Sequence, residues 1–171
     1  MNKIIPIMAG IVAISASPAL AAGDTKEYPV TASVAAKCTA QTGSTNELDF
    51  GALTTNADGT LSGSYTKSFS KAAFVCNGAA TTIDATATPM TNAVTPTSSD
   101  FTDTINYGVK IELGDYTGTF ETTGSGIAGA TLGEQAGTLK VTADSLAPAS
   151  SKALIAGDYT GAITITITPA A

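Results

Sequence analysis

The stretch "AGDYTGAITITITPAA", residues 156–171, places isoleucine and threonine at alternating positions. Such alternation is typical of a β-strand that buries one face and exposes the other to solvent. The buried face would carry Tyr159, Ile163, Ile165 and Ile167, and the exposed face Thr164, Thr166 and Thr168. A strand of this kind needs a neighbouring strand beside it, so another segment must pair with it.

A period of two recurs in several other segments. They are rich in β-branched residues and lie between turn-forming clusters of Gly, Asn, Asp and Pro: residues 28–34, 81–88, 104–113 and 138–143. Outside the N-terminal leader, no window shows the apolar spacing of a helix. About seven short strands without intervening helices predict an all-β fold, and specifically a β-sandwich.

A glycine-rich segment matches a nucleotide-binding fingerprint only in its letters. "GSGIAG", residues 124–129, satisfies the spacing GxGxxG. The fingerprint binds a dinucleotide only between a strand and a helix, whereas "ATLGEQAGTL" follows here without a helix start. We therefore expect residues 124–130 to form a surface loop, as we do for the Asp-Gly turn in "NADGT", residues 56–60.

The first 21 residues have the pattern of an export signal. Lys3 supplies a positive charge, an apolar run follows, and "ALA" at residues 19–21 is a small-residue cleavage pattern. Pro6 interrupts the run, which is also shorter than the roughly 20 residues that a membrane-spanning helix needs. We therefore expect residues 1–21 to be removed on export and to leave no membrane span.

The charged residues exclude several classes of function. The formal net charge is −6, or −7 once Lys3 is removed, and all eight basic residues are scattered lysines. The chain therefore has no arginine fork or basic stripe to bind phosphate. The sequence also contains no histidine, which excludes Ser-His-Asp and Cys-His catalysis and removes the commonest zinc ligand. We expect no nucleic-acid partner, no catalytic or metal-binding residues and no cofactor.

Acidic residues leave one enzymatic alternative open. Asp100 lies near Asp103, and Glu112 lies near Asp115. Two carboxylates can hydrolyse a glycoside when they face one cleft. Because Asp and Glu are rarely buried, solvated surface acids are the preferred interpretation, and we expect the chain not to be an enzyme.

Two cysteines, Cys38 and Cys76, are the only ones in the chain. An even number in an exported protein favours a disulfide. In the chain-entropy model the loop that it closes is worth roughly 4 kcal/mol. The alternatives, a CxxC redox pair or a thiolate metal site, lack the close spacing and the further ligands.

Two partners are possible for the C-terminal strand. Residues 28–34 of the same molecule could pair with it and close the sheet. Alternatively, the domain is one strand short, and residues 28–34 of a neighbouring molecule fill the gap by β-strand addition. The alternation of residues 28–34 is compatible with both arrangements.

Several features together resemble the spore coat protein U family, which includes the major pilins of archaic chaperone–usher fimbriae. They are the leader, the alternating segment with a cysteine after it, "LDFGAL" at residues 48–53, the cysteine in "AFVCNG", and the terminal "AGDYTGAITITIT". The similarity covers most of the mature chain. Its most specific motif is the closing Gly-Asp-Tyr followed by the alternating strand.

The resemblance implies an incomplete immunoglobulin-like β-sandwich that lacks its last strand and is completed by donor-strand exchange. Residues 22–36 would form the donor segment and residues 37–171 the sandwich domain. The donor side chains would be Tyr28, Val30, Ala32 and Val34; the strand beside the acceptor groove would present Ile163, Ile165 and Ile167; and Cys38 and Cys76 would form the structural bridge.

The resemblance also implies partners and a location. The partners would be other copies or sibling pilins, a periplasmic chaperone and an outer-membrane usher. After passing through the periplasm, the chain would form an extracellular fibre that supports adhesion and biofilm formation. The alternative is a secreted or surface β-sandwich, adhesive or carbohydrate-binding, which stays a stable monomer with its N-terminal strand paired within the same molecule.

Overall fold

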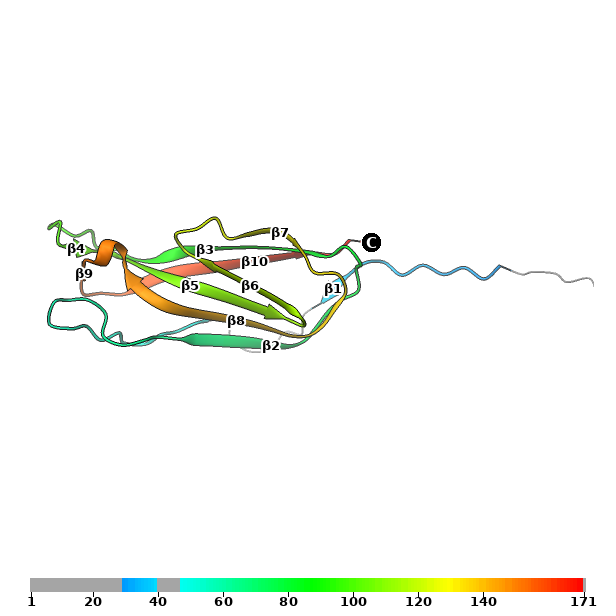
Figure 1. Ribbon diagram of the computed structural model, residues 1–171, viewed down its shortest axis with the longest axis horizontal. Helices are drawn as coiled ribbons and strands as arrows, with labels where there is room; N and C mark the ends of the chain where they lie inside the picture. The colour runs from blue at the N-terminus through cyan, green and yellow to red at the C-terminus, as the bar shows by residue number, and fades with distance from the viewer. Residues whose placement is uncertain (1–28, 40–46, 171) are drawn as a thin grey trace, which may run out of the picture. The chain divides into compact units, whose positions relative to one another are not determined.

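The structure is a computed structural model that describes residues 29–39 and 47–170, except for the side chains of residues 72 and 73. The chain divides into two units, residues 1–33 and 34–171, and each is described by itself. The second unit contains β1 (Cys38–Thr39), β2 (Lys67–Cys76), β3 (Thr82–Asn92), β4 (Phe101–Thr102), β5 (Thr104–Leu113), β6 (Tyr116–Glu121), β7 (Ile127–Thr131), β8 (Gln135–Pro148), the short 3-10 turn η1 (Ala149–Ser151), β9 (Ala153–Leu154) and β10 (Tyr159–Thr168) (Figure 1).

The all-β fold class is confirmed. β5 begins and ends where the period of two predicts, and its alternate side chains from Ile105 to Leu113 are buried. β3 begins one residue after the start of the predicted segment 81–88 and extends to Asn92, β8 contains the predicted segment 138–143, and β10 covers Tyr159 to Thr168 of the C-terminal stretch. Among the described residues, no helix is long and apolar enough to cross a membrane. The leader, residues 1–21, lies outside the described residues.

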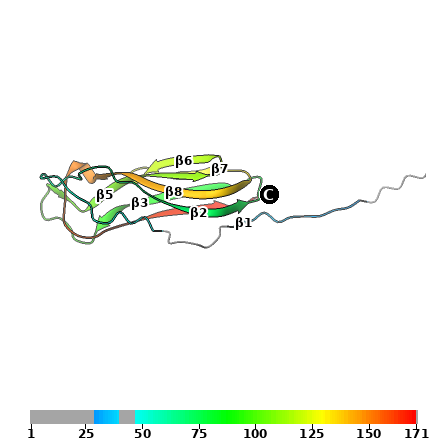
Figure 2. The ribbon, with the colours of Figure 1, turned by 90° about the horizontal axis from the view of Figure 1, so that it is seen from below.

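The strands form a sandwich-like arrangement around one core. The hydrogen-bonded path runs β1-β2-β8-β5-β3-β10, with β6 paired to β5 and β7 paired to β3. Figure 2 shows β6 and β7 at one margin, and β2 at the opposite margin with the red strand β10. The inner faces bury Phe74, Cys76, Ile83, Ala85, Tyr107, Val109, Ile111, Leu113, Leu139, Val141 and Ala143. β1 and β10 are the two ends of the hydrogen-bonded path.

The structure corrects the expectation that residues 28–34 form a β-strand. Tyr28 lies outside the described residues, and residues 29–34 belong to no strand. Val30 and Val34 are 95% and 84% exposed. An isolated extended segment forms no ladder without a neighbour, and Pro29 has no N–H to donate, so alternation alone does not make this segment a strand.

The glycine-rich segment corrects a second expectation, because residues 127–131 form strand β7 and not a loop. β7 pairs with β3, with Thr131 opposite Thr82. Gly126 has a φ of +79°, and a Cβ there would collide with the carbonyl oxygen of Ala85. The lack of a side chain at Gly126 therefore allows the backbone to come close to β3. The prediction of a surface loop did not include this contact. The Asp-Gly turn at residues 56–60 is confirmed: Gly59 N donates to Asn56 O at 2.9 Å.

Candidate functional site

A hollow of about 1310 Å³ lies between β10 and residues 47–55, at the margin where the hydrogen-bonded path ends. We call it the β10 groove. Its lining is mostly apolar: Leu48, Phe50, Ala52, Leu53, Phe69, Met90, Tyr107, Leu139, Ala143, Leu154, Ile155, Ala156, Ala162, Ile163 and Ile165. Charged side chains contribute to the lining only through Glu47, Asp49, Lys71 and Asp158. The groove is thus a mixed surface, more apolar than polar, that is open to solvent.

One wall of the groove is strand β10. Ile163 and Ile165 line the groove and are half-buried, whereas Thr164 and Thr166 on the other face are exposed. β10 pairs with β3 from Tyr159 to Thr168 and ends the sheet path. Among the strands of the described residues, β10 has no second neighbour, so one edge of its backbone is free of strand pairing.

The opposite wall consists of residues 47–55. Residues 47–50 belong to no strand, and Leu48 and Phe50 pack against the core while half-exposed. The wall is fastened at its far end, because Thr54 N donates to the Tyr65 hydroxyl at 2.8 Å. The hydrogen bond to the Thr54 side chain is the main cause that lowers the pKa of Tyr65. This wall is therefore held at Thr54 and Thr55, which pair with residues 61 and 62, whereas its residues 47–50 belong to no strand of the described residues.

The floor of the groove is held by a buried tyrosine. Tyr107 on β5 donates its hydroxyl to the Thr88 carbonyl oxygen on β3 at 2.9 Å. It also reaches the Ala162 carbonyl oxygen on β10 at 3.3 Å. Burial raises the pKa of Tyr107, so the hydroxyl stays a proton donor at neutral pH. Tyr107 thereby fixes β10 across the core from β5.

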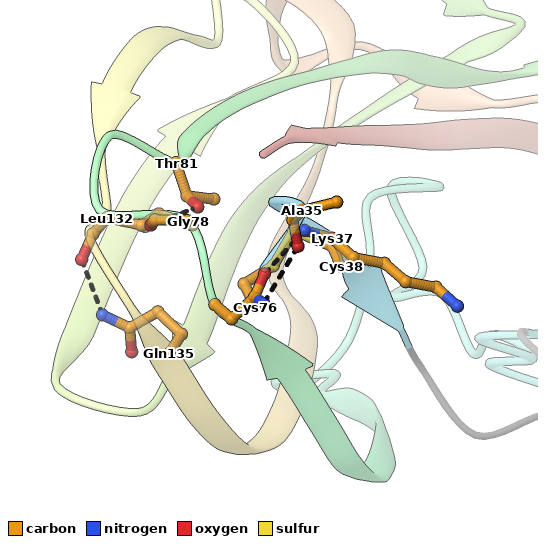
Figure 3. Close-up of a disulfide and its surroundings, with 9 residues drawn as sticks. Ala35, Lys37, Cys38, Cys76, Gly78, Thr81, Leu132 and Gln135 are labelled. Atoms are coloured by element: carbon orange, nitrogen blue, oxygen red, sulfur yellow. Dashed lines mark hydrogen bonds between the residues drawn. A yellow bond between two sulfur atoms is a disulfide. The ribbon is translucent and has the colours of Figure 1, made fainter. Parts of the chain in front are cut away.

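A disulfide joins Cys38 on β1 to Cys76 on β2, which confirms the predicted bridge. Cys76 is 2% exposed and belongs to the core. Figure 3 shows the bridge at the end of β2, with Ala35 and Lys37 beside it. The disulfide thus attaches the start of the sandwich unit to the strand next to the groove.

The predicted site residues have different outcomes in the structure. Ile163 and Ile165 line the β10 groove, whereas Ile167 packs against the core and is not among the lining residues, and the role of all three beside an acceptor groove stays a prediction. Val30, Ala32 and Val34 are exposed and in no strand. Their role as donor side chains stays a prediction.

Sequence reasoning missed most of the groove. Leu48 and Phe50 stand in the quoted "LDFGAL" motif, which was a signal for this wall. Phe69, Met90 and Leu139 come from separate strands, and no local pattern groups them. The floor is therefore visible only once the strands are packed.

The acidic pairs are not brought together into the groove. Asp100 lines a separate shallow hollow with Asp58 and Lys152, and Asp103 accepts a hydrogen bond from the Thr104 hydroxyl at 2.9 Å. Glu112 binds two lysines, so Lys110 and then Lys140 lower the pKa of its carboxyl group. Within residues 29–39 and 47–170, no group of three or more His, Cys, Asp or Glu side chains could hold a metal ion.

The chain was compared with protein-family models, with curated proteins and with solved structures. None of the three comparisons found a match.

Proposed function

We propose that this chain is a structural subunit of an extracellular chaperone–usher fimbria of the spore coat protein U type. In this proposal the domain is an immunoglobulin-like sandwich that lacks one strand. Residues 22–36 of one copy form the donor segment, its alternating residues 28–34 enter the β10 groove of another copy, and repetition of this step builds the fibre. A periplasmic chaperone and an outer-membrane usher deliver the exported subunits, and the fibre supports adhesion and biofilm formation.

The observation that carries the proposal is the free edge of β10 beside an apolar hollow. Fully burying an exposed isoleucine side chain is worth about 1.5 to 3 kcal/mol, and the half-buried Ile163 and Ile165 would each gain the part of this that remains. An added strand would bury both and would also satisfy backbone groups of β10 and of residues 47–50. Because an uncovered edge of this kind aggregates, a subunit with this groove would need a chaperone before assembly.

The exposed N-terminal segment is the occupant that the sequence offers. Val30 and Val34 are 95% and 84% exposed, and they alternate with Thr31 and Ser33. In a strand, Val30, Ala32 and Val34 would point to one face and could enter an apolar groove together. The groove and the segment therefore match in polarity and in period.

A peptide-binding experiment tests the proposal. Mature protein that lacks residues 22–34 is mixed with a peptide of residues 22–36, and the melting temperature is followed. At a peptide concentration about 100-fold above Kd, we expect Tm to rise by roughly 5–10 °C. The matched control is the same peptide with Val30→Asn and Val34→Asn, which should give almost no shift.

Two results would contradict the proposal. One is an equal Tm shift with both peptides, because the alternating valines would then have no role. The other is a monodisperse, fully folded monomer of the complete mature chain whose groove is already closed. That result would favour the alternative, a secreted β-sandwich that binds a ligand and does not polymerise.

A further inference from the structure

The side chain of Asn77 continues the β1–β2 pairing beyond its last residue pair. The ladder ends at Cys38 opposite Cys76. Beyond it, Lys37 N donates to Asn77 Oδ1 at 2.6 Å, and Asn77 N donates to Lys37 O at 3.2 Å. Asn77 Nδ2 also donates to Ala35 O at 3.1 Å. We call this set, Asn77 with Ala35 and Lys37, the Asn77 latch.

The latch lies on a well-supported part of the fold. On one side of it, Cys76 is held by the disulfide. On the other side, the buried Thr81 donates its hydroxyl to Gly78 O at 2.7 Å, as Figure 3 shows. Ala80 N donates to Ala170 O at 3.2 Å, and a Cβ at Gly78 would collide with the same carbonyl oxygen. The latch therefore lies at the end of the sandwich where β10 also ends.

The latch fixes the direction of residues 35–37 within the sandwich unit. In the antiparallel β1–β2 ladder, Thr39 lies opposite Val75 and Cys38 opposite Cys76. Followed backward from Cys38, the chain leads past the end of β2. The groove residues Ile163 and Ile165 lie in the other direction, back along β10. A segment preceding the latch must therefore reverse its direction to enter the groove of its own molecule.

A reversal consumes residues that the groove needs. A β-turn takes four residues. Residues 35–37 are held by the latch, so the turn would fall on residues 31–34. Ala32 and Val34 would then lie in the turn and not in the strand. A closed monomer would lose two of the alternating side chains, whereas insertion into another copy loses none.

We propose that Asn77 is a positioning residue that prevents the chain's own N-terminal segment from filling its own β10 groove and so leaves the groove for a second copy. This inference rests on the proposed function and adds the residue that decides between pairing within one molecule and pairing between molecules.

The experiment compares Asn77→Ala, Asn77→Asp and the wild-type mature protein. The measured quantity is the ratio of closed monomer to fibre after dilution, by size-exclusion chromatography. Loss of two side-chain hydrogen bonds should raise this ratio roughly tenfold in Asn77→Ala. Asn77→Asp keeps the acceptor for Lys37 N but loses the donor to Ala35 O, so its ratio should lie between the two.

A second readout separates positioning from simple stability. Pairing between molecules makes the melting temperature depend on protein concentration, whereas pairing within one molecule does not. In Asn77→Ala the melting temperature should depend less on protein concentration than in wild type. The control is Asn56→Ala, which removes side-chain hydrogen bonds to Thr60 and Leu61 in an exposed loop and should behave as wild type.

A variant with Asn-Gly inserted between Val34 and Ala35 keeps Asn77 intact and supplies a hairpin turn outside the latch. It should form the same closed monomer, so the inference can be tested even if Asn77→Ala fails to fold. If both Asn77→Ala and the insertion variant show the wild-type ratio of closed monomer to fibre while wild type still polymerises, the role of the latch is contradicted. The proposed function would not be contradicted by that result. A wild-type chain that itself forms a closed monomer would contradict the proposed function as well.

Discussion

The two margins of the sandwich differ in how they are covered: one is closed by strands in contact, and the other is open. At one margin, β6 and β7 face each other, and the side chain of Ile127 reaches over Gly118 so closely that a Cβ there would collide with it. Thr122, in the connection between these strands, is buried and donates its backbone N–H to Tyr107 O at 3.0 Å. At the other margin, β10 ends the sheet path beside a hollow of about 1310 Å³.

The comparison shows that the open margin is a local feature of a well-packed domain. The core residues Ile83, Ile105, Ile111 and Val141 are fully buried. Within the described residues, no buried side-chain nitrogen or oxygen lacks a hydrogen-bond partner. A poorly specified sequence would leave defects throughout its core, whereas here the core is closely packed and a hollow lies beside one strand edge.

Deleting residues 22–34 should have the largest effect, because it removes the segment that we expect to fill the open margin. We expect complete loss of fibres, since the open margin would have no occupant, while the closed margin and the disulfide remain. Electron microscopy of the mature protein at matched concentration measures the loss. The control keeps the length and composition of residues 22–34 but scrambles their order, and fibres formed by that control would contradict the role of the alternation.

Ile165→Asp should weaken the open margin specifically. The substitution replaces an apolar wall residue with a charge that a bound strand would bury. We expect the peptide of residues 22–36 to bind roughly 30- to 150-fold more weakly, or about 2–3 kcal/mol, in a calorimetric titration. Thr166→Asp, on the exposed face of the same strand, is the control. Equal losses in both variants would show that the bound strand does not contact the Ile165 face.

Ile127→Ala should weaken the closed margin specifically. Ile127 packs against the core and against β6, so its truncation should lower the free energy of unfolding by about 1–3 kcal/mol. Chemical denaturation measures this change. Peptide affinity at the open margin should stay within about twofold of wild type, because distant sites contribute independently. A large loss of affinity would mean that the two margins are coupled.

Glu112→Gln should have the smallest effect and should leave both margins unchanged. Glu112 binds Lys110 at 2.9 Å and Lys140 at 3.2 Å, which lowers the pKa of its carboxyl group below the ordinary value of 4.5. Its stabilisation is therefore present above pH 4.5 and is lost as the pH falls through the lower pKa of the folded state. Tm measured from pH 7 to 3 should converge for wild type and variant at low pH, with Glu134→Gln as the control; a constant difference would contradict the ion-pair origin.

The sequence predicts the regular strands well because their alternation is unbroken. β5 has every second side chain buried over ten residues, and β10 repeats isoleucine three times. The disulfide also follows from there being only two cysteines. These elements define the fold class, the position of the bridge and one wall of the β10 groove.

The missed strands have interrupted patterns. β2 has a register shift between Lys71 and Phe74, so its apolar residues change parity midway. β6 places Gly118 on its inward face, where Ile127 of β7 fills the space of the missing side chain. β7 is short and rich in glycine. In each case the compensating contact comes from another strand, which a local pattern cannot contain.

Mixed-labelled fibres test the central claim most directly. Copies with ¹³C-labelled valine are assembled with copies that carry ¹⁵N-labelled isoleucine, and contacts between molecules are recorded by solid-state NMR. We predict intermolecular contacts of Val30 and Val34 with Ile163 and Ile165. Fibres in which these residues are in contact only within one molecule, or not at all, would contradict the claim that a second copy completes the open margin.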